Sequence, residues 1–325
     1  MEYTKLGRSG LLVSRLSLGT MNFGNATDEK ESFAIMDRAL DAGINFFDTA
    51  NVYGGAGNHG RTEEIIGRWF AQGGGRRERV VLATKVYGDM ENAEDGPNAP
   101  RGLSAYKIRR HLDGSLKRLQ TDHIELYQMH HVDRSVSWDE LWGAFEAAVN
   151  HGKIDYIGAS NFAARDLVKA QYEAKARNFL GLVSEQHKYN LLCRLPELEV
   201  LPAALEHGIG VIPWSPLAGG LLGGHAFEQR AGARASADHL DEATRAKLQA
   251  FAALAREAGE KEADLALAWM LANPAVTAPI IGPRTLKQLE DTLHVLDVKM
   301  DDGLMDRLDA IFPGPGGEAP QAYAW

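Results

Sequence analysis

The sequence predicts an α/β protein built as a (β/α)8 barrel, or TIM barrel, with long βα loops and a C-terminal tail. Short apolar segments rich in branched residues alternate with amphipathic segments eight times along 325 residues. The apolar segments are nearly continuous, as expected of parallel strands that helices cover. No shift in composition divides the chain, so we expect one domain over residues 1–325, with 313–325 as its tail.

The eight apolar segments are the predicted strands. They occupy residues 16–19, 44–48, 80–85, 124–129, 154–158, 182–185, 209–213 and 276–281. Pro213 and Pro279 lie in the last two, although proline cannot donate a hydrogen bond within a sheet.

The segments between them show helical spacing of apolar residues. The first helix is expected to begin at Thr27, with acidic residues in its first turn, and to end at Gly43. Ser104 is the expected N-cap of a helix that reaches Leu119. Further helical patterns cover residues 62–70, 141–148, 164–174 and 195–205.

Three irregular segments exceed the usual loop length of about 4–6 residues: 88–103, 218–240 and 313–325. The first two follow predicted strands on the face where barrel active sites lie, so we expect them to influence substrate choice. We predict that Tyr323 and Trp325 cover the substrate pocket; the alternative is a terminus that is disordered or contacts another subunit.

Charge and composition exclude several classes of protein. Lys+Arg number 35 and Asp+Glu 44, a net charge of −9, so no basic field favours nucleic acid. The single cysteine, Cys193, excludes an internal disulfide framework and a multi-cysteine metal site. No apolar stretch of about 18 residues predicts a membrane span. We expect a cytoplasmic protein that binds neither nucleic acid nor membrane, and the sequence leaves its oligomeric state open.

Two short motifs have alternative interpretations. Residues 55–60 match the dinucleotide motif G-x-G-x-x-G, but no predicted strand directly precedes them, which favours a loop. His131 and Asp133, beside His130, resemble part of an iron site, which would indicate a metal-dependent barrel hydrolase. No distal histidine completes that site, so we expect no bound metal.

Polar side chains follow the predicted strands. Asp48 ends the second strand, Tyr53 lies in the next loop, Lys85 ends the third strand, and His130 follows the fourth. The carboxyl ends of parallel strands meet at one end of a barrel, so these four titratable side chains should lie together. The later strands are followed by Ser160, Asn161, Gln186, Trp214 and Ser215.

These residue types match the reduction of a carbonyl group. A lysine cation held by Asp48 should stabilise a phenolate and lower the pKa of Tyr53 from its usual value near 10. His130 could polarise a substrate carbonyl by a hydrogen bond. Amide side chains and the flat ring of Trp214 suit the carboxamide and ring of a nicotinamide, which would supply hydride.

Eight motifs occur in order along nearly the whole chain: GTM at 19–21, DTANVYG at 48–54, ATK at 83–85, LYQMH at 126–130, GASNF at 158–162, SEQ at 184–186, PWSPLAG at 213–219 and IGPR at 281–284. With them the chain resembles the aldo-keto reductase superfamily. The resemblance implies a TIM barrel that binds NADP(H) without a Rossmann fold.

The resemblance also implies roles for single residues. Tyr53 would be the general acid/base, tuned by Lys85 and Asp48, while His130 orients the carbonyl. Arg284 would approach the 2′-phosphate, which favours NADPH over NADH. The implied cofactor contacts are Thr20, Met21, Asp48, Ser160, Asn161, Gln186, Trp214, Ser215, Pro216, Leu217, Gly219, Gly282, Arg284, Gln288 and Asp291.

Two departures from the family pattern affect cofactor binding. Thr292 stands where an adenine-binding asparagine is usual. Gly224 and His225 stand where a lysine often contacts the cofactor, so Arg230 or Arg234 is the alternative for that role.

The chain is most similar to bacterial reductases of the sugar and general aldehyde branch, some of which act on nucleotide-linked keto-deoxysugars. The leading hypothesis is an NADPH-dependent reductase of a small-molecule carbonyl substrate: an aldehyde, a ketone or a keto-sugar. The alternative is a slow-turnover, NADP(H)-sensing binding subunit that resembles potassium-channel β subunits.

Overall fold

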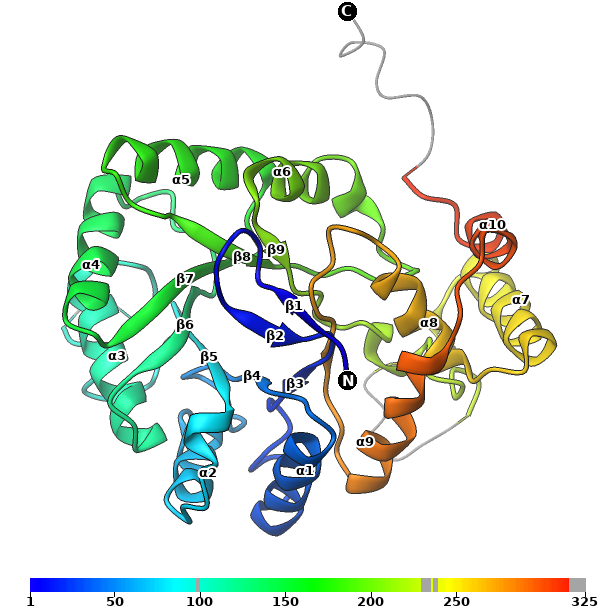
Figure 1. Cartoon of the computed structure of the whole chain (residues 1–325), viewed down its shortest axis with the longest axis horizontal. Coiled ribbons are helices and arrows are strands. Elements are labelled where there is room, and N and C mark those ends of the chain that lie inside the picture. The colour runs from blue at the N-terminus through cyan, green and yellow to red at the C-terminus, as the bar shows by residue number, and fades with distance from the viewer. Residues whose placement is uncertain (98–99, 229–234, 236–238, 316–325) are drawn as a thin grey trace, which may run out of the picture.

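The computed structural model describes residues 1–97, 100–228, 235 and 239–315. Its main sheet has eight parallel strands in the order β10-β3-β4-β5-β6-β7-β8-β9, which confirms the predicted (β/α)8 fold (Figure 1). The strands are β3 (Ser17–Gly19), β4 (Phe46–Asp48), β5 (Val81–Val86), β6 (Ile124–Met129), β7 (Ile154–Ser160), β8 (Leu182–Gln186), β9 (Gly210–Val211) and β10 (Ile280–Ile281).

The barrel closes between β9 and the segment that leads into β10. Val211 forms a parallel bridge with Val276 and accepts a hydrogen bond of 2.8 Å from the Thr277 N–H. Pro213 and Pro279 lie outside the two strands predicted to contain them, which are therefore shorter than expected. Neither proline can donate to a neighbouring strand, but their carbonyl groups still accept from Ile280 and Ser17 at 2.9 and 3.1 Å.

Helices surround the sheet (Figure 1). They are α1 (Glu29–Asp41), α2 (Arg61–Phe70), α3 (Ala105–Leu119), α4 (Trp138–Asn150), α5 (Ala164–Ala176), α6 (Val200–His207), α7 (Glu242–Ala258), α8 (Glu262–Leu271), α9 (Leu286–Thr292) and α10 (Asp302–Ile311). Short 3-10 helices are η1 (Arg77–Arg79), η2 (Leu195–Glu197), η3 (Ala218–Gly220) and η5 (Leu293–Asp297). Within the described ranges, no helix combines the length and apolar character needed to cross a membrane.

Side-chain hydrogen bonds determine where several helices begin. Ser104 accepts from the Lys107 N–H and caps α3, as predicted. The cap of α1 is Asp28, which accepts from the Glu31 N–H at 2.8 Å, and not Thr27 as expected. The Thr27 hydroxyl instead donates to the Arg284 carbonyl at 3.0 Å, because the chain entering α1 lies against the loop after β10.

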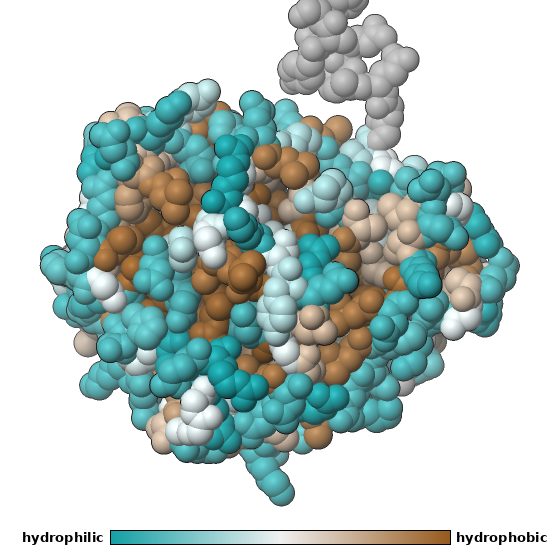
Figure 2. All heavy atoms as spheres, viewed as in Figure 1, coloured by the Kyte–Doolittle hydropathy of each residue, from teal (hydrophilic) through white to brown (hydrophobic). Residues whose placement is uncertain are grey.

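The sequence did not predict an N-terminal hairpin of β1 (Tyr3–Lys5) and β2 (Leu12–Ser14). In Figure 1 this hairpin lies over the middle of the sheet, at the end of the barrel that faces the viewer. Leu6 and Val13 are fully buried there in one apolar cluster with Phe46, Ala83 and Leu126. In the same view, Figure 2 shows hydrophilic surface around the rim and hydrophobic surface nearer the centre. The hairpin closes the N-terminal end of the barrel.

Candidate active site

The opposite end of the barrel interior holds a buried ion pair. Asp48 ends β4, and its Oδ2 accepts a hydrogen bond of 2.7 Å from Lys85 Nζ on the neighbouring β5. Lys85 Nζ also donates to the Thr49 carbonyl at 2.8 Å and to Tyr53 Oη at 3.2 Å. The structure therefore brings three of the four predicted catalytic side chains into direct contact.

The second carboxylate oxygen of Asp48 is held by two amides. Gln128 Nε2 on β6 and Gln186 Nε2 on β8 donate to Asp48 Oδ1 at 3.1 and 2.8 Å. Since β8 is not a neighbour of β4, this contact crosses the barrel interior. Sequence reasoning did not select Gln128 as a site residue. The available signal was a polar residue in β6 two positions after the inward-facing Leu126, and therefore on the same face of the strand.

Lys85 is charged despite complete burial. Burial opposes its ammonium charge, but the Asp48 carboxylate and the Tyr53 phenol outweigh this effect, so the pKa of Lys85 is raised. The Lys85 ammonium also lies over the Tyr53 ring, with Nζ 4.8 Å from the ring centroid.

The predicted lowering of the Tyr53 pKa is wrong in its net direction. Burial raises the pKa of the phenol above its usual value; Lys85 opposes that rise, and the Asp48 charge adds to it. Desolvation of a phenolate outweighs the attraction of one cation that is already paired with a carboxylate. Tyr53 is therefore protonated near neutral pH and can act as a proton donor.

His130 completes the predicted catalytic group. Its ring meets the Tyr53 ring edge to face with centroids 6.0 Å apart, and it stacks on His131 at 5.4 Å. Burial, followed by the charges of Lys85 and His131, lowers the pKa of His130 well below its usual value. His130 is thus a neutral imidazole that can donate one hydrogen bond to an oxygen lying between it and Tyr53.

The ends of β7 and β8 supply a second group of polar side chains. Asn161 adopts the left-handed conformation with φ 60°, and its Nδ2 donates to the His130 carbonyl at 3.1 Å. Asn161 Oδ1 accepts from Trp214 Nε1 at 3.1 Å, which orients the indole, and the Ser160 hydroxyl donates to the Gln186 carbonyl at 2.9 Å. No described residue donates to Gln186 Oε1, which leaves this oxygen available to a carboxamide.

The segment after Trp214 presents backbone donors. Ser215 has φ 53° and Gly219 φ 72°, and the chain turns sharply between them. The N–H groups of Ser215, Leu217 and Gly219 donate to no residue that the structure describes. Several backbone N–H groups without described protein partners in one short segment suit an anionic group such as a pyrophosphate, so this segment fits the predicted cofactor.

The predicted adenosine contacts on α9 already have protein partners. Gln288 Oε1 accepts from the Arg284 N–H at 2.7 Å, and the Thr292 hydroxyl donates to the Gln288 carbonyl at 2.8 Å. Asp291 pairs with Lys287 at 2.8 Å and with Lys261 at 3.4 Å. These partners hold Gln288 Oε1 and the Asp291 carboxylate in place on α9, while Gln288 Nε2 donates to no described residue.

The remaining predicted contacts lie on the loops after β3 and β10. The Thr20 hydroxyl donates to the Asp48 carbonyl at 2.9 Å, which links the loop after β3 to the end of β4. Met21 is 44% exposed, and the Gly282 carbonyl accepts from Asn22 Nδ2 at 2.9 Å. Arg230, Arg234, Tyr323 and Trp325, to which the sequence assigned cofactor or substrate roles, lie outside the described residues.

The structure contradicts both alternative motifs. Residues 55–60 lie in a loop that leads into α2, several residues after β4 ends at Asp48, and not directly after a strand. Asp133 accepts from the Leu103 N–H at 3.0 Å and from the Ser135 hydroxyl at 2.5 Å. Among the residues described, His130, His131 and Asp133 do not bring their ligand atoms together as a metal site requires.

Buried polar contacts hold the loop of residues 88–103, the first of the long segments noted in the sequence. Asp95 accepts from the Met90 N–H at 3.0 Å and from Lys107 Nζ of α3 at 3.2 Å. Burial and the Lys107 charge lower the pKa of His111, beside Asp95, to about 4. His111 Nδ1 lies 2.8 Å from Asn51 Nδ2, so this network reaches the loop that carries Tyr53.

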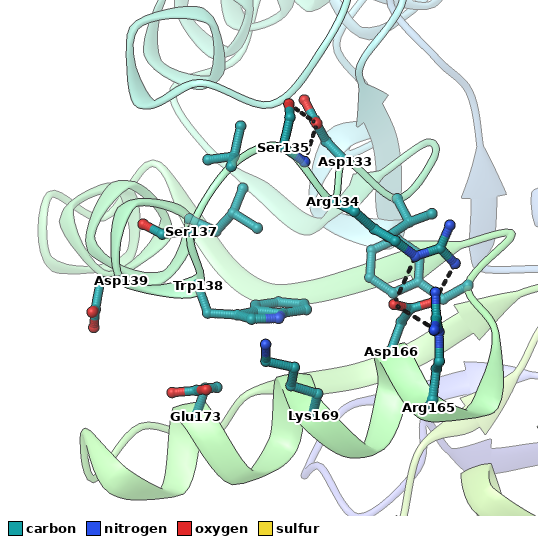
Figure 3. A pocket seen from close by; sticks show the side chains of 14 residues that line it. Asp133, Arg134, Ser135, Ser137, Trp138, Asp139, Arg165, Asp166, Lys169 and Glu173 are labelled. Carbon is teal, nitrogen blue, oxygen red and sulfur yellow. Dashed lines mark hydrogen bonds and ion pairs between the residues drawn. The ribbon is translucent and has the colours of Figure 1, made fainter.

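A pocket of about 690 Å³ lies between the β6–α4 loop and α5 (Figure 3). In Figure 3 the Trp138 indole lies beside Lys169, and Arg134 forms an ion pair with Asp166 at 2.6 Å. The residues predicted from the sequence for catalysis or cofactor binding are not among those that line it.

A known protein family matches nearly the whole chain. Residues 15–312 match the model of the Aldo/keto reductase family. The chain belongs to the aldo/keto reductase family. It is accordingly an oxidoreductase, and aldo/keto reductases generally use NAD(P)H.

Individual relatives of this aldo/keto reductase carry different names. It is 65% identical to "Uncharacterized oxidoreductase YrpG" of Bacillus subtilis (strain 168) over 326 residues, 100% of each chain. It is 35% identical to "Probable voltage-gated potassium channel subunit beta" of Oryza sativa subsp. japonica, over 96% of each chain. It is 31% identical to "Versiconal hemiacetal acetate reductase" of Aspergillus parasiticus, over 97% of this chain and 99% of that one.

Proposed function

We propose that this aldo/keto reductase is an NADPH-dependent reductase of aldehydes, ketones or keto-sugars, with Tyr53 as its general acid. One observation carries the proposal: Lys85 Nζ lies 2.7 Å from Asp48 Oδ2 and 3.2 Å from Tyr53 Oη at the open end of the barrel. A phenol beside a buried, carboxylate-bound ammonium has both a proton to donate and a cation to stabilise the phenolate that remains.

NADPH, when bound, supplies a hydride to the carbonyl carbon of the substrate. Tyr53 Oη donates its proton to the carbonyl oxygen as negative charge develops there. The Lys85 ammonium, 3.2 Å away, stabilises the phenolate. His130, neutral because its pKa is lowered, donates a hydrogen bond to the same oxygen and so polarises the carbonyl.

Three groups of residues support binding of the cofactor. Gln186 Oε1 and the Ser160 hydroxyl can meet a carboxamide, and the Trp214 indole, held by Asn161, can stack on a nicotinamide ring. The backbone N–H groups of residues 215, 217 and 219 can meet the pyrophosphate. We assign the 2′-phosphate to Arg284, because a guanidinium matches phosphate geometry.

The test is the Tyr53→Phe variant in an NADPH-oxidation assay across aldehydes, aldoses and keto-sugars, repeated with NADH. Loss of the proton donor should lower kcat about 10²- to 10⁴-fold. NADPH binding, followed by quenching of tryptophan fluorescence, should be unchanged, since the hydroxyl is not a predicted cofactor contact.

Tyr106→Phe, which removes a hydroxyl from an exposed position on α3, is the matched control and should keep full activity. Undiminished turnover of Tyr53→Phe would refute Tyr53 as the acid. A higher kcat/KM with NADH than with NADPH would refute the cofactor assignment.

A second candidate function is a slow-turnover NADP(H)-binding subunit. The 35% identity to a relative named as a probable potassium channel subunit favours it, and the cofactor segment fits both functions. A rate of NADPH oxidation above about 1 s⁻¹ with any substrate of the panel is typical of a metabolic enzyme and would exclude this candidate.

A further inference from the structure

We propose that Glu260, Asp264 and His294 bind one divalent transition-metal ion, at a site separate from the proposed active site. The three residues lie after α7, in the first turn of α8, and in η5. One ligand atom from each lies within 4.8 Å of the other two. His294 Nε2 lies 2.9 Å from Glu260 Oε2, so an imidazole and a carboxylate already face each other.

The second observation is the state of Asp264. This residue is 1% exposed, and its buried Oδ2 atom has no hydrogen-bond partner among the described residues. No described residue forms an ion pair with it either: Lys261, the nearest lysine in sequence, pairs with Asp291 at 3.4 Å. A buried carboxylate without a partner is costly, and a cation between Asp264 and Glu260 would remove that cost.

The donor set indicates which ions fit. Two carboxylate oxygens and one imidazole nitrogen suit Zn²⁺, Mn²⁺ or Co²⁺, whereas Mg²⁺ and Ca²⁺ prefer oxygen ligands alone. A dication also balances the two carboxylate charges. The side chains of His294 and Glu260 are 51% and 22% exposed, so water can complete the coordination and the ligands can move inward. Metal–ligand distances of about 2.0–2.2 Å require such a movement.

The sequence predicts no metal, because its only short ligand pattern, at His130, His131 and Asp133, lacks a distal histidine. His294 lies 30 or more residues after the other two proposed ligands, and packing of α8 against η5 brings it to them. The ion would join the turn after α7 to α8 and to η5, which directly follows α9, so its binding should stabilise this part of the fold.

The test uses the full-length, untagged protein after treatment with EDTA, titrated with Zn²⁺ and then Mn²⁺ by isothermal calorimetry. We expect one Zn²⁺ per chain. Asp264→Asn and His294→Ala should each weaken Zn²⁺ binding by at least about tenfold, since each removes a ligand. His151→Ala, which removes an exposed histidine at the C-terminal end of α4, should bind Zn²⁺ like the wild type.

Thermal unfolding gives an independent readout that does not need reductase activity. In EDTA, Asp264→Asn should melt at or above the wild-type temperature, because the substitution removes a buried unpaired charge. In saturating Zn²⁺ the order should reverse, because only the wild type gains the full stabilisation of a bound ligand. Zn²⁺ binding that is absent, or equally tight in the wild type and both ligand variants, would overturn the proposal.

Discussion

The two ends of the barrel interior are built from the same strands but have opposite chemistry. At the N-terminal end, apolar side chains form one cluster under the β1–β2 hairpin. At the other end, residues two positions later form the hydrogen-bonded group around Asp48. The pairs, one from each of three neighbouring strands, are Phe46 and Asp48, Ala83 and Lys85, and Leu126 and Gln128.

Within each of these strands, one residue contributes to stability and the residue two positions later contributes to the proposed reaction. Alternate residues of a strand face the same side, so both members of each pair lie inside the barrel. The apolar layer contributes by burial, at roughly 25 cal/mol per Å² of apolar surface. The polar layer contains a buried ion pair, which rarely adds stability over an apolar pair of equal volume. We infer that the polar layer is there for its reaction.

The largest expected effect is that of Lys85→Met. Removing one partner of a buried ion pair leaves Asp48 charged and unpaired, so the free energy of unfolding should fall by about 3–5 kcal/mol. Reductase kcat should also fall by at least about 10²-fold, because no cation then faces the Tyr53 phenol. Urea unfolding and steady-state assays measure the two effects.

The double variant Asp48→Asn/Lys85→Met separates the effect on stability from the effect on activity. Removing both charges, while an amide oxygen at position 48 still accepts from Gln128 and Gln186, should restore most of the lost stability, and activity should stay absent. A double variant as unstable as Lys85→Met would contradict the inference that the polar layer serves the reaction.

Leu6→Ala examines the apolar end. Leu6 directly follows β1 in the hairpin and is fully buried, and truncation of a buried leucine costs about 2–5 kcal/mol. The kcat of the folded protein should be unchanged, because the substitution is at the end of the barrel away from Tyr53. Leu12→Ala, at a 55% exposed position of the same hairpin, should change stability by less than about 0.5 kcal/mol. Loss of kcat in Leu6→Ala would show that the two ends are coupled.

The smallest expected effect is that of pH on reduction. Burial raises the pKa of Tyr53 above 10, the pKa of Lys85 is raised as well, and that of His130 lies well below 6.5. All three therefore keep the required protonation state, and kcat should vary less than about twofold between about pH 7 and 9. Oxidation of the alcohol needs the phenolate and should instead become faster as pH rises. A fall in reductase kcat across this range would place the Tyr53 pKa lower than its burial indicates.

Much of the site could be predicted because the relevant pattern is local. Asp48 and Lys85 end apolar strands, and strand ends in a parallel barrel meet, so their contact follows from sequence position. Gln128 was missed because a polar residue inside a strand does not reveal its partner. The predicted lengths of β9 and β10 were too great, because the apolar segments that contain them include Pro213 and Pro279.

The sequence by itself determined the fold class and the set of polar residues at the end of the barrel, since both depend on spacing along the chain. Only the tertiary structure decided the hairpin that closes the other end, the raised pKa of Tyr53, and the proximity of Glu260, Asp264 and His294. Burial is the physical reason. The desolvation of a phenol or a carboxylate depends on elements distant in sequence, whose packing the local pattern does not contain.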